Sequence, residues 1–237
     1  MSQEKKTRTV SLFREYFELI TETLVFVFFV VTFVFQSFVV PTGSMEKTLL
    51  VGDHVFVTKF IFGPTVFDWE RAILPVKEIS RGDVIVFRYP ENPVQDFVKR
   101  AVGMPGDSLS IRDKEVWVDG SPVRVATAWH SDPNVYSSSN TDIPDLIVRD
   151  NYDGLLIAKD HYFAMGDNRD NSLDSRYWGA LNRSYIKGSP WLIWWGYEGS
   201  REQYLATGIV DKIKGIGRTM SNLISGTRWE RTLKRIR

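Results

Sequence analysis

The chain has 237 residues, of which 43% are hydrophobic and 14% aromatic, so it is long enough for one well-filled domain or a domain with a large insertion. Its net charge of +1 implies no bulk attraction to nucleic acid. It contains no cysteine, which excludes a disulfide scaffold, a zinc–thiolate site and a cysteine nucleophile.

An apolar run near the N-terminus is predicted to be a membrane anchor. Residues 19–40 are rich in Phe and Val, and no charged residue occurs from Thr23 to Val40. About 20 apolar residues are enough to cross the core of a bilayer. A continuous run so rich in Phe, with no polar face, argues against a buried core element of a soluble domain. The run is also longer than the apolar core of a cleavable signal peptide, which is about 7–15 residues. A single, uncleaved transmembrane helix over 19–40 is therefore expected.

The flanks of this run predict its orientation in the membrane. Four Lys or Arg residues precede it and two follow within the next 20 residues or so: Lys5, Lys6, Arg8 and Arg14, then Lys47 and Lys59. Basic residues are retained on the cytoplasmic side. Residues 1–18 are therefore expected to be a cytoplasmic tail, and the chain after Val40 is expected on the extracytoplasmic face.

Residues 41–205 are predicted to form an all-β domain. Short runs rich in Val, Ile, Phe and Tyr alternate with turns rich in Gly, Pro, Asp and Asn, which is typical of antiparallel sheets. The expected strands lie within residues 53–62, 84–89, 96–102, 109–111, 116–118, 161–165 and 189–197. A β-rich insertion is expected at about 112–160, and its part from 126 to 153 reads as irregular.

The remaining segment, residues 206–237, is basic. It holds eight Lys or Arg residues against Asp211 and Glu230. This composition fits an amphipathic helix on anionic lipid, and it fits equally well a solvated helix or coil. Both interpretations stay open.

Ser44 and Lys99 are the candidates for a nucleophile and its base. Ser44 lies in the glycine turn Pro41-Thr42-Gly43-Ser44-Met45, directly after the apolar run. Strand alternation places Lys99 on one face with Phe97 and Ala101. Burial among apolar groups disfavours a charged amine and lowers its pKa, so that a neutral lysine can take the proton of a serine hydroxyl.

Other catalytic and metal sites have weaker support in the sequence. None of the three histidines has a metal-binding spacing, and no motif places one beside Ser44 to build a Ser-His-Asp triad. The acidic stretch 167–174 fails the calcium-loop template, because Trp178 stands where that template requires Glu. No metal ion is therefore expected.

Four segments resemble the bacterial type I signal peptidases, which cut signal peptides off exported preproteins: 41–49, 52–57, 81–107 and 166–179. The last, Gly-Asp-Asn-Arg-Asp-Asn-Ser-Leu-Asp-Ser-Arg-Tyr-Trp-Gly, is the most specific because it is long. The resemblance covers about residues 20–200. It implies a transmembrane helix followed by a mainly β catalytic domain of the signal-peptidase type in the bacterial inner membrane. It further implies signal peptides and membrane lipid as partners, without a cofactor or nucleic acid.

The resemblance also implies the roles of individual residues. Ser44 matches the nucleophile and Lys99 the general base, while Thr42 and the Ser44 backbone N–H match the two oxyanion donors. Residues expected to orient or brace the site are Ser172, Asp167, Asp174 and Arg176. The Ser172 hydroxyl is expected to accept a hydrogen bond from the Lys99 amine and so orient it. Residues expected to line the substrate pockets are Phe38, Val40, Met45, Phe97 and Val98. Lys47 departs from the family, which often has proline there.

The expected function is cleavage of preproteins after small residues in an Ala-x-Ala-like pattern, through an ester on Ser44. Two other functions stay open. A self-cleaving Ser–Lys protease domain would explain the dyad but gives no reason for an anchor. A non-catalytic, membrane-anchored β module would explain the anchor but leaves the 166–179 segment without a role.

Overall fold

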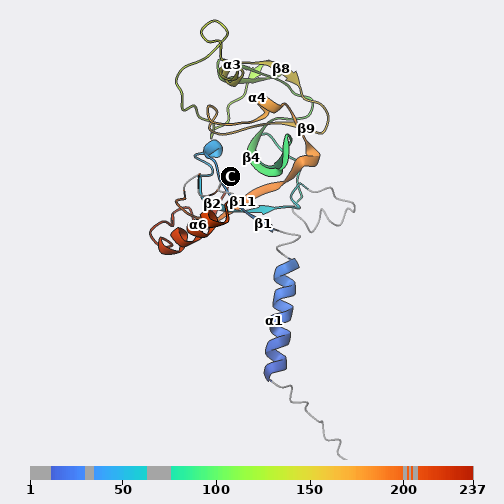
Figure 1. Cartoon of the computed structure of the whole chain (residues 1–237). Helices are drawn as coiled ribbons and strands as arrows, with labels where there is room; N and C mark the ends of the chain where they lie inside the picture. The colour runs from blue at the N-terminus through green and yellow to red at the C-terminus, as the bar shows by residue number, and fades with distance from the viewer. Residues whose placement is uncertain are drawn as a thin grey trace, which may run out of the picture.

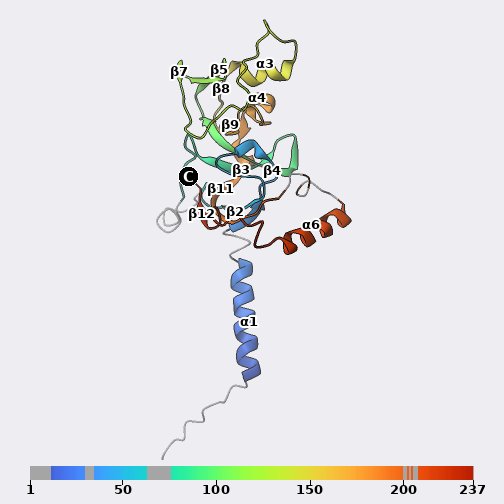
Figure 2. The ribbon, with the colours of Figure 1, turned by 90° about the vertical axis from the view of Figure 1, so that its left-hand side faces the viewer.

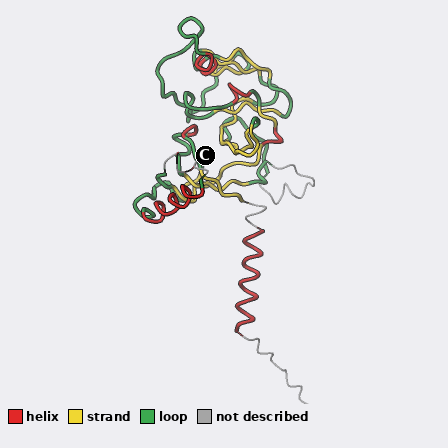
Figure 3. Tube along the Cα trace, in the orientation of Figure 1, coloured by secondary structure: helices red, strands yellow, loops and turns green. Residues whose placement is uncertain are grey.

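The computed structural model describes residues 12–29, 35–62, 76–199, 202, 204 and 208–236. An N-terminal helix, α1 (Leu12–Phe29), projects from a domain that is built mainly of antiparallel strands (Figure 1). Figure 3 shows that strands and loops make up most of this domain, with a few short helices at its periphery. The prediction of a mainly β fold is confirmed.

The larger sheet has eight strands, and segments from both ends of the chain build it. Their spatial order is β1 (Phe35–Val39), β2 (Asp53–Thr58), β11 (Ile186–Gly196), β3 (Val84–Tyr89), β4 (Asn92–Gly103), β9 (His161–Met165) and β10 (Leu181–Asn182), and β12 (Lys234–Arg235) also pairs with β11. Every pairing is antiparallel. The late strands β9 and β11 thus lie directly beside the early strands that carry the candidate site.

The smaller sheet holds the predicted insertion. Its four strands lie in the order β7 (Ser121–Pro122), β6 (Glu115–Val118), β5 (Ser108–Arg112) and β8 (Tyr152–Leu156). Asp113 and Lys114 join β5 to β6 with φ angles of 48° and 69°, the positive pair that a tight hairpin turn requires. Helix α3 (Pro144–Asp150) corrects the prediction of an irregular segment at 126–153. Pro144 stands in its first turn, where a missing N–H costs nothing.

Three buried apolar clusters fill the domain. The cluster that bears on the site joins the turn after β1 to strands β2, β3 and β11, and its buried members are Val40, Met45, Leu49, Val55, Val57, Val84, Val86 and Ile193. Met45 and Leu49 are at most 1% exposed, and burying such a side chain contributes about 1.5–3 kcal/mol. The burial of Met45 and Leu49 fixes the position of the turn that follows β1.

The strand predictions are largely confirmed. β3 and β9 have the predicted bounds, and β2, β5, β6 and β11 fall at the predicted places with small shifts at their ends. β4 is longer than predicted, because it continues backwards to Asn92 and pairs with β3 there. Short elements complete the domain: η2 (Gly43–Met45), α4 (Ser175–Trp178) and η3 (Arg183–Tyr185).

The N-terminal segment differs from the predicted helix over 19–40. α1 begins at Leu12 and ends at Phe29, and Phe35–Val39 forms the edge strand β1. Phe and Val favour strands as well as apolar helices, and here they pair with β2 in a register that sets Phe35 opposite Thr58. In the described part of the chain, no helix combines the length and the apolar character needed to cross a bilayer.

The basic C-terminal segment is helix α6 (Ile209–Ser221) followed by a chain that packs on the large sheet. Arg231 is buried and its guanidinium pairs with Asp53 of β2 at 2.6 Å. Lys234 and Arg235 form β12 on β11. Figures 1 and 2 both place α6 at the end of the domain nearest α1, and α3 and β8 at the opposite end.

Candidate active site

Ser44 lies in η2, the single turn of 3₁₀ helix that follows β1. Val40, shortly before this turn, and Met45, its last residue, are buried in the same apolar cluster. The Ser44 carbonyl accepts a hydrogen bond of 3.0 Å from the backbone N–H of Asn168. The nucleophile candidate is therefore fixed by the core and by the 166–179 segment together, although some 120 residues separate them in sequence.

Lys99 lies in the middle of β4 and reaches Ser44. The two side chains are buried, and Lys99 Nζ lies 2.5 Å from Ser44 Oγ. The Phe97 ring centroid is 5.5 Å from the same Nζ atom. Burial is the largest cause that lowers the pKa of Lys99, to about 8, although the charge of Asp174 acts to raise it. At that pKa about a tenth of the amine is neutral at pH 7, where a free lysine is almost fully charged.

Asp174 and Arg176 form a buried ion pair beside the dyad. Asp174 is 0% exposed, and its two carboxylate oxygens accept from Arg176 Nε at 2.8 Å and Nη2 at 2.9 Å. Asp174 also caps α4 and accepts from the Gly166 N–H at 3.1 Å. Burial acts to raise the pKa of Asp174, but the Arg176 charge and these hydrogen bonds outweigh it and hold that pKa below its usual value.

Asp167 forms a second buried pair, with Arg100 of β4. Arg100 Nε and Nη2 donate to the two carboxylate oxygens, each at 2.8 Å. Thr48 donates to the same carboxylate at 2.6 Å, and Thr127 at 3.0 Å. Burial acts to raise the pKa of Asp167, but the hydrogen bond from Arg100 and the others outweigh it. This pair joins β4, the η2 region and the 166–179 segment.

Ser172 lies at the site but does not make the predicted hydrogen bond to Lys99. Its Oγ atom is buried and has no hydrogen-bond partner in the described part of the chain. It packs against Gly166, where an added Cβ would lie 2.3 Å from Ser172 Oγ and 2.6 Å from the Ser44 carbonyl oxygen. Only glycine fits between these two serines.

Thr42 directly precedes η2 as its N-cap residue. It is half-buried and forms no capping hydrogen bond to the turn. Further along, Lys47 has a φ of 79°, in the left-handed region. Proline fixes φ near −65°, so a proline could not adopt the conformation that Lys47 has here.

Four of the five predicted pocket residues lie together. Val40 and Met45 are buried in the first apolar cluster, and Phe38 and Val98 pack against it. Phe97 packs in the neighbouring cluster, where its ring stacks on Tyr89 at 4.4 Å between centroids. The two groups lie on opposite faces of β4, because Phe97 and Val98 are consecutive residues of a strand.

Each histidine has partners of its own. His54 stacks on Trp195 at 4.7 Å between centroids, and His130 Nδ1 lies 3.3 Å from Asp170. His161 Nε2 lies 3.3 Å from the amide of Asn182. Burial lowers the pKa of His54 and of His130.

Three contributors were missed in the sequence: Arg100, Gly166 and the backbone of Asn168. Arg100 directly follows Lys99, and its side chain faces the other side of β4 from the base. Gly166 and Asn168 belong to the segment singled out for its side chains, whereas these two act through the backbone. The available signal for Gly166 was its place directly after the predicted strand 161–165. Its contacts with Ser44 and Ser172 arise only in the fold.

The chain is similar to proteins described as signal peptidases. The family model described as "Signal peptidase, peptidase S26" matches residues 13–195. Signal peptidase I of Pseudomonas aeruginosa is 35% identical over 187 residues, which covers 69% of this chain and 66% of that protein. Signal peptidase I of Buchnera aphidicola subsp. Acyrthosiphon pisum is 28% identical, with 81% of this chain and 77% of that protein covered. A solved signal peptidase I from Enterococcus faecalis has a TM-score of 0.37 at 25% identity, with 48% of this chain and 97% of that one covered.

Proposed function

Because the chain belongs to the signal peptidase family, peptidase S26, we propose that Ser44 and Lys99 are the nucleophile and general base of its peptide-bond hydrolysis. Its activity is that of a signal peptidase, a serine endopeptidase that acts on exported preproteins. The observation that carries the proposed dyad is the 2.5 Å contact between Lys99 Nζ and Ser44 Oγ in a buried site. Family membership favours this activity over a self-cleaving domain or a binding module.

In the first half of the reaction the neutral Lys99 amine takes the proton of the Ser44 hydroxyl, and Ser44 Oγ attacks the carbonyl carbon of the scissile bond. The resulting oxyanion accepts from the Ser44 backbone N–H and the Thr42 hydroxyl. The intermediate then collapses to an ester on Ser44. The leaving amine takes the proton from the Lys99 ammonium and departs with the mature protein.

In the second half water replaces the mature protein. Lys99, neutral again, takes a proton from a water molecule, whose oxygen attacks the ester carbonyl. Collapse of this second intermediate breaks the bond to Ser44 Oγ, which recovers its proton from Lys99. The signal peptide leaves with a new carboxylate. The charges of the buried Asp174–Arg176 pair act on the amine.

Small side chains before the cleavage site follow from the apolar cluster around Ser44. Val40 and Met45 are buried beside the nucleophile, and Phe38 and Val98 pack against them. We propose that these four residues form the walls of the pockets for the first and third substrate positions before the cut. An alanine-sized group fits there, whereas a larger one overpacks the walls.

The direct test is cleavage of a purified preprotein in detergent. Wild type is expected to release the mature protein after an Ala-x-Ala sequence, and Ser44→Ala is expected to release none. Mass spectrometry of the products gives the cleavage position. Cleavage by Ser44→Ala at the wild-type rate would assign the chemistry to another residue.

Thr42 provides a test of the oxyanion site. Thr42→Val keeps the shape of the side chain and removes the hydroxyl, and loss of such a donor lowers kcat by about 10²–10³-fold. Thr42→Ser keeps the hydroxyl and is expected to retain most of the rate. Equal kcat values for the two variants would make Thr42 a turn residue only.

We also propose that the chain is anchored once in the bacterial inner membrane, with the β domain on the extracytoplasmic face. Family members are membrane-associated in bacteria. Twelve large apolar side chains of α1 are exposed, so lipid would cover a surface that no described protein residue covers. Two of its polar side chains bond within the helix: Thr21 and Thr23 donate to the carbonyls of Phe17 and Leu19.

The C-terminal segment supports a second membrane contact. Met220, Leu223, Ile224, Trp229 and Leu233 are each more than half exposed. Cationic side chains accompany them, while Arg231 and β12 fasten this segment to the sheet. The segment lies at the end of the domain nearest α1 (Figure 2). Apolar side chains among cations suit the headgroup region of an anionic bilayer.

A fluorescent label tests this contact, and the absence of cysteine makes single labelling simple. Ile224→Cys carrying an NBD dye is expected to show a blue-shifted, brighter emission when the full chain is placed in phosphatidylglycerol-containing nanodiscs. Leu156→Cys is the matched control, because Leu156 is 73% exposed, close to the 76% of Ile224. Leu156 ends β8, which Figure 1 shows at the far end of the domain from α1. Identical emission at both positions would place the segment in water.

A further inference from the structure

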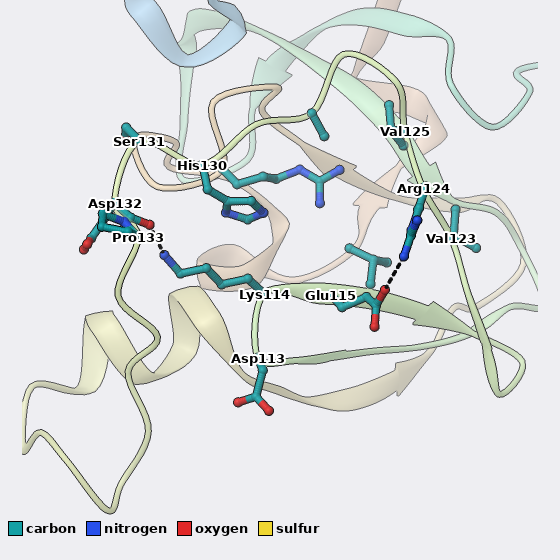
Figure 4. Close-up of a pocket in the computed structure, with 13 residues that line it drawn as sticks. Asp113, Lys114, Glu115, Val123, Arg124, Val125, His130, Ser131, Asp132 and Pro133 are labelled. Atoms are coloured by element: carbon teal, nitrogen blue, oxygen red, sulfur yellow. Dashed lines mark hydrogen bonds and ion pairs between the residues drawn. The ribbon is translucent and has the colours of Figure 1, made fainter.

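A cavity that the peptidase chemistry does not use lies beside the 167–169 segment. Its volume is about 750 Å³, and the β5–β6 turn, the loop at 123–133 and Arg169 surround it (Figure 4). Neither Ser44 nor Lys99 lines it. Part of its wall is apolar, formed by Val116, Val123, Val125 and Ala128. This volume lies within the range of small-molecule sites.

Most charged groups at the cavity have partners. Arg124 lies 3.7 Å from Glu115, and Lys114 Nζ donates to the backbone carbonyl of Asp132 at 2.8 Å, as the dashed lines in Figure 4 show. The carboxylate of Asp132 in turn accepts from Arg149 at 3.1 Å. These contacts leave the rim close to neutral.

Arg169 is different, because it is a buried cation without a compensating anion in the described part of the chain. It is 4% exposed, its Nε atom has no hydrogen-bond partner, and no described carboxylate forms an ion pair with it. Asp167 and Asp174 act on its charge, but they already pair with Arg100 and Arg176. Burial lowers the pKa of Arg169 to about 10, so the group stays charged at neutral pH. An unpaired buried charge is costly, and an anion would remove that cost.

We propose that this cavity binds a small organic anion, a carboxylate or phosphate group on a short apolar body. The guanidinium fork of Arg169 suits both groups, since each can accept two parallel N–H bonds. The valine wall packs against the apolar body. The N–H of Asn168 donates to the Ser44 carbonyl at 3.0 Å. Arg169 is the next residue in the chain, so the residue proposed to bind the anion directly follows the one that positions the nucleophile.

Thermal unfolding of the full chain in detergent tests the site. The probes are butyrate, its neutral counterpart butyramide, and propyl phosphate, at constant ionic strength set with chloride. At about ten times Kd, a bound anion is expected to raise Tm by about 3–6 °C, and butyramide is expected to leave it unchanged. The larger shift of the two anions tells whether a carboxylate or a phosphate is the preferred group.

Arg169→Met assigns the effect to this residue. Loss of a charged hydrogen-bond donor is expected to weaken anion binding by about 10–150-fold. Arg124→Gln is the control at the rim, where the side chain is mostly in water, and it is expected to keep the Tm shift. In the Ser44→Ala chain the shift is also expected to remain, so the result is independent of the proposed dyad.

A second measurement covers the unliganded protein. Removal of an unpaired buried charge is expected to keep or raise the Tm of Arg169→Met without ligand. The site is overturned if Arg169→Met shows the wild-type anion shift, or if butyrate and butyramide act equally. It is also overturned if the unliganded variant melts well below wild type and wild type shows no anion shift, because the charge of Arg169 is then compensated within the folded chain.

Discussion

Replacement of Lys99 by alanine is expected to lower kcat for preprotein cleavage by about 10⁴-fold or more, because the base and the later proton donor are the same group. The fold is expected to survive, since the change removes a buried amine and leaves β4 paired with β3 and β9. Lys99→His is expected not to restore activity, because the imidazole ring is too short to reach Ser44. Lys187→Ala is the control, because Lys187 pairs with Asp96 at a partly exposed site.

Single-turnover cleavage assays and circular dichroism of each variant decide the outcome. The expected pattern is an unchanged spectrum for Lys99→Ala, Lys99→His and Lys187→Ala, with activity lost only in the two Lys99 variants. Substantial cleavage by a folded Lys99→Ala chain would show that another group removes the Ser44 proton.

Replacement of Asp174 by alanine is expected to have the largest effect on stability. It leaves Arg176 buried without its carboxylate and removes the acceptor of the Gly166 N–H. Loss of one partner of a buried ion pair costs about 3–5 kcal/mol, which lowers Tm by about 6–20 °C for a chain of this size. Activity is expected to fall as well, because Gly166 packs directly against Ser172 and the Ser44 carbonyl.

Asp96→Ala is the matched control for this prediction. Its pair with Lys187 is partly exposed, and such pairs contribute at most about 1 kcal/mol. The double variant Asp174→Ala/Arg176→Met is expected to regain part of the lost Tm, because it removes the unpaired cation too. A Tm for Asp174→Ala within about 2 °C of the Asp96→Ala value would mean that the buried pair does not stabilise the site.

Much of the fold could be predicted because local pattern and final environment agree. Residues 84–89 and 161–165 are apolar runs bounded by turn residues, and they form β3 and β9 with the predicted bounds. The apolar run at 19–40 was ambiguous, because its local pattern fits two different environments. Its Phe and Val residues suit a helix in lipid and a strand in a sheet, and only pairing with β2 decides that Phe35–Val39 is a strand.

Some features of the candidate site could likewise be predicted from the sequence, and others could not. Strand alternation predicted a desolvated Lys99, and the structure places that side chain in a buried position beside Phe97 and Ser44. The predicted hydrogen bond from the Lys99 amine to the Ser172 hydroxyl is not present, and Ser172 packs against Gly166. The Arg100–Asp167 pair could not be predicted either, since its two residues meet only through the pairing of β4 with β9.

The pH dependence of kcat/KM for preprotein cleavage tests the dyad most directly. A Lys99 amine with a pKa lowered by burial to about 8 must lose its proton before it can act as a base. The rate should therefore rise with pH as one proton is lost, with a midpoint near 8, below the value of about 10.4 for a free lysine. A midpoint near 6.5 would indicate a histidine base, and a midpoint above 10 would indicate a solvated lysine. Either result, or a rate independent of pH between 6 and 10, would contradict the proposed Ser44–Lys99 chemistry.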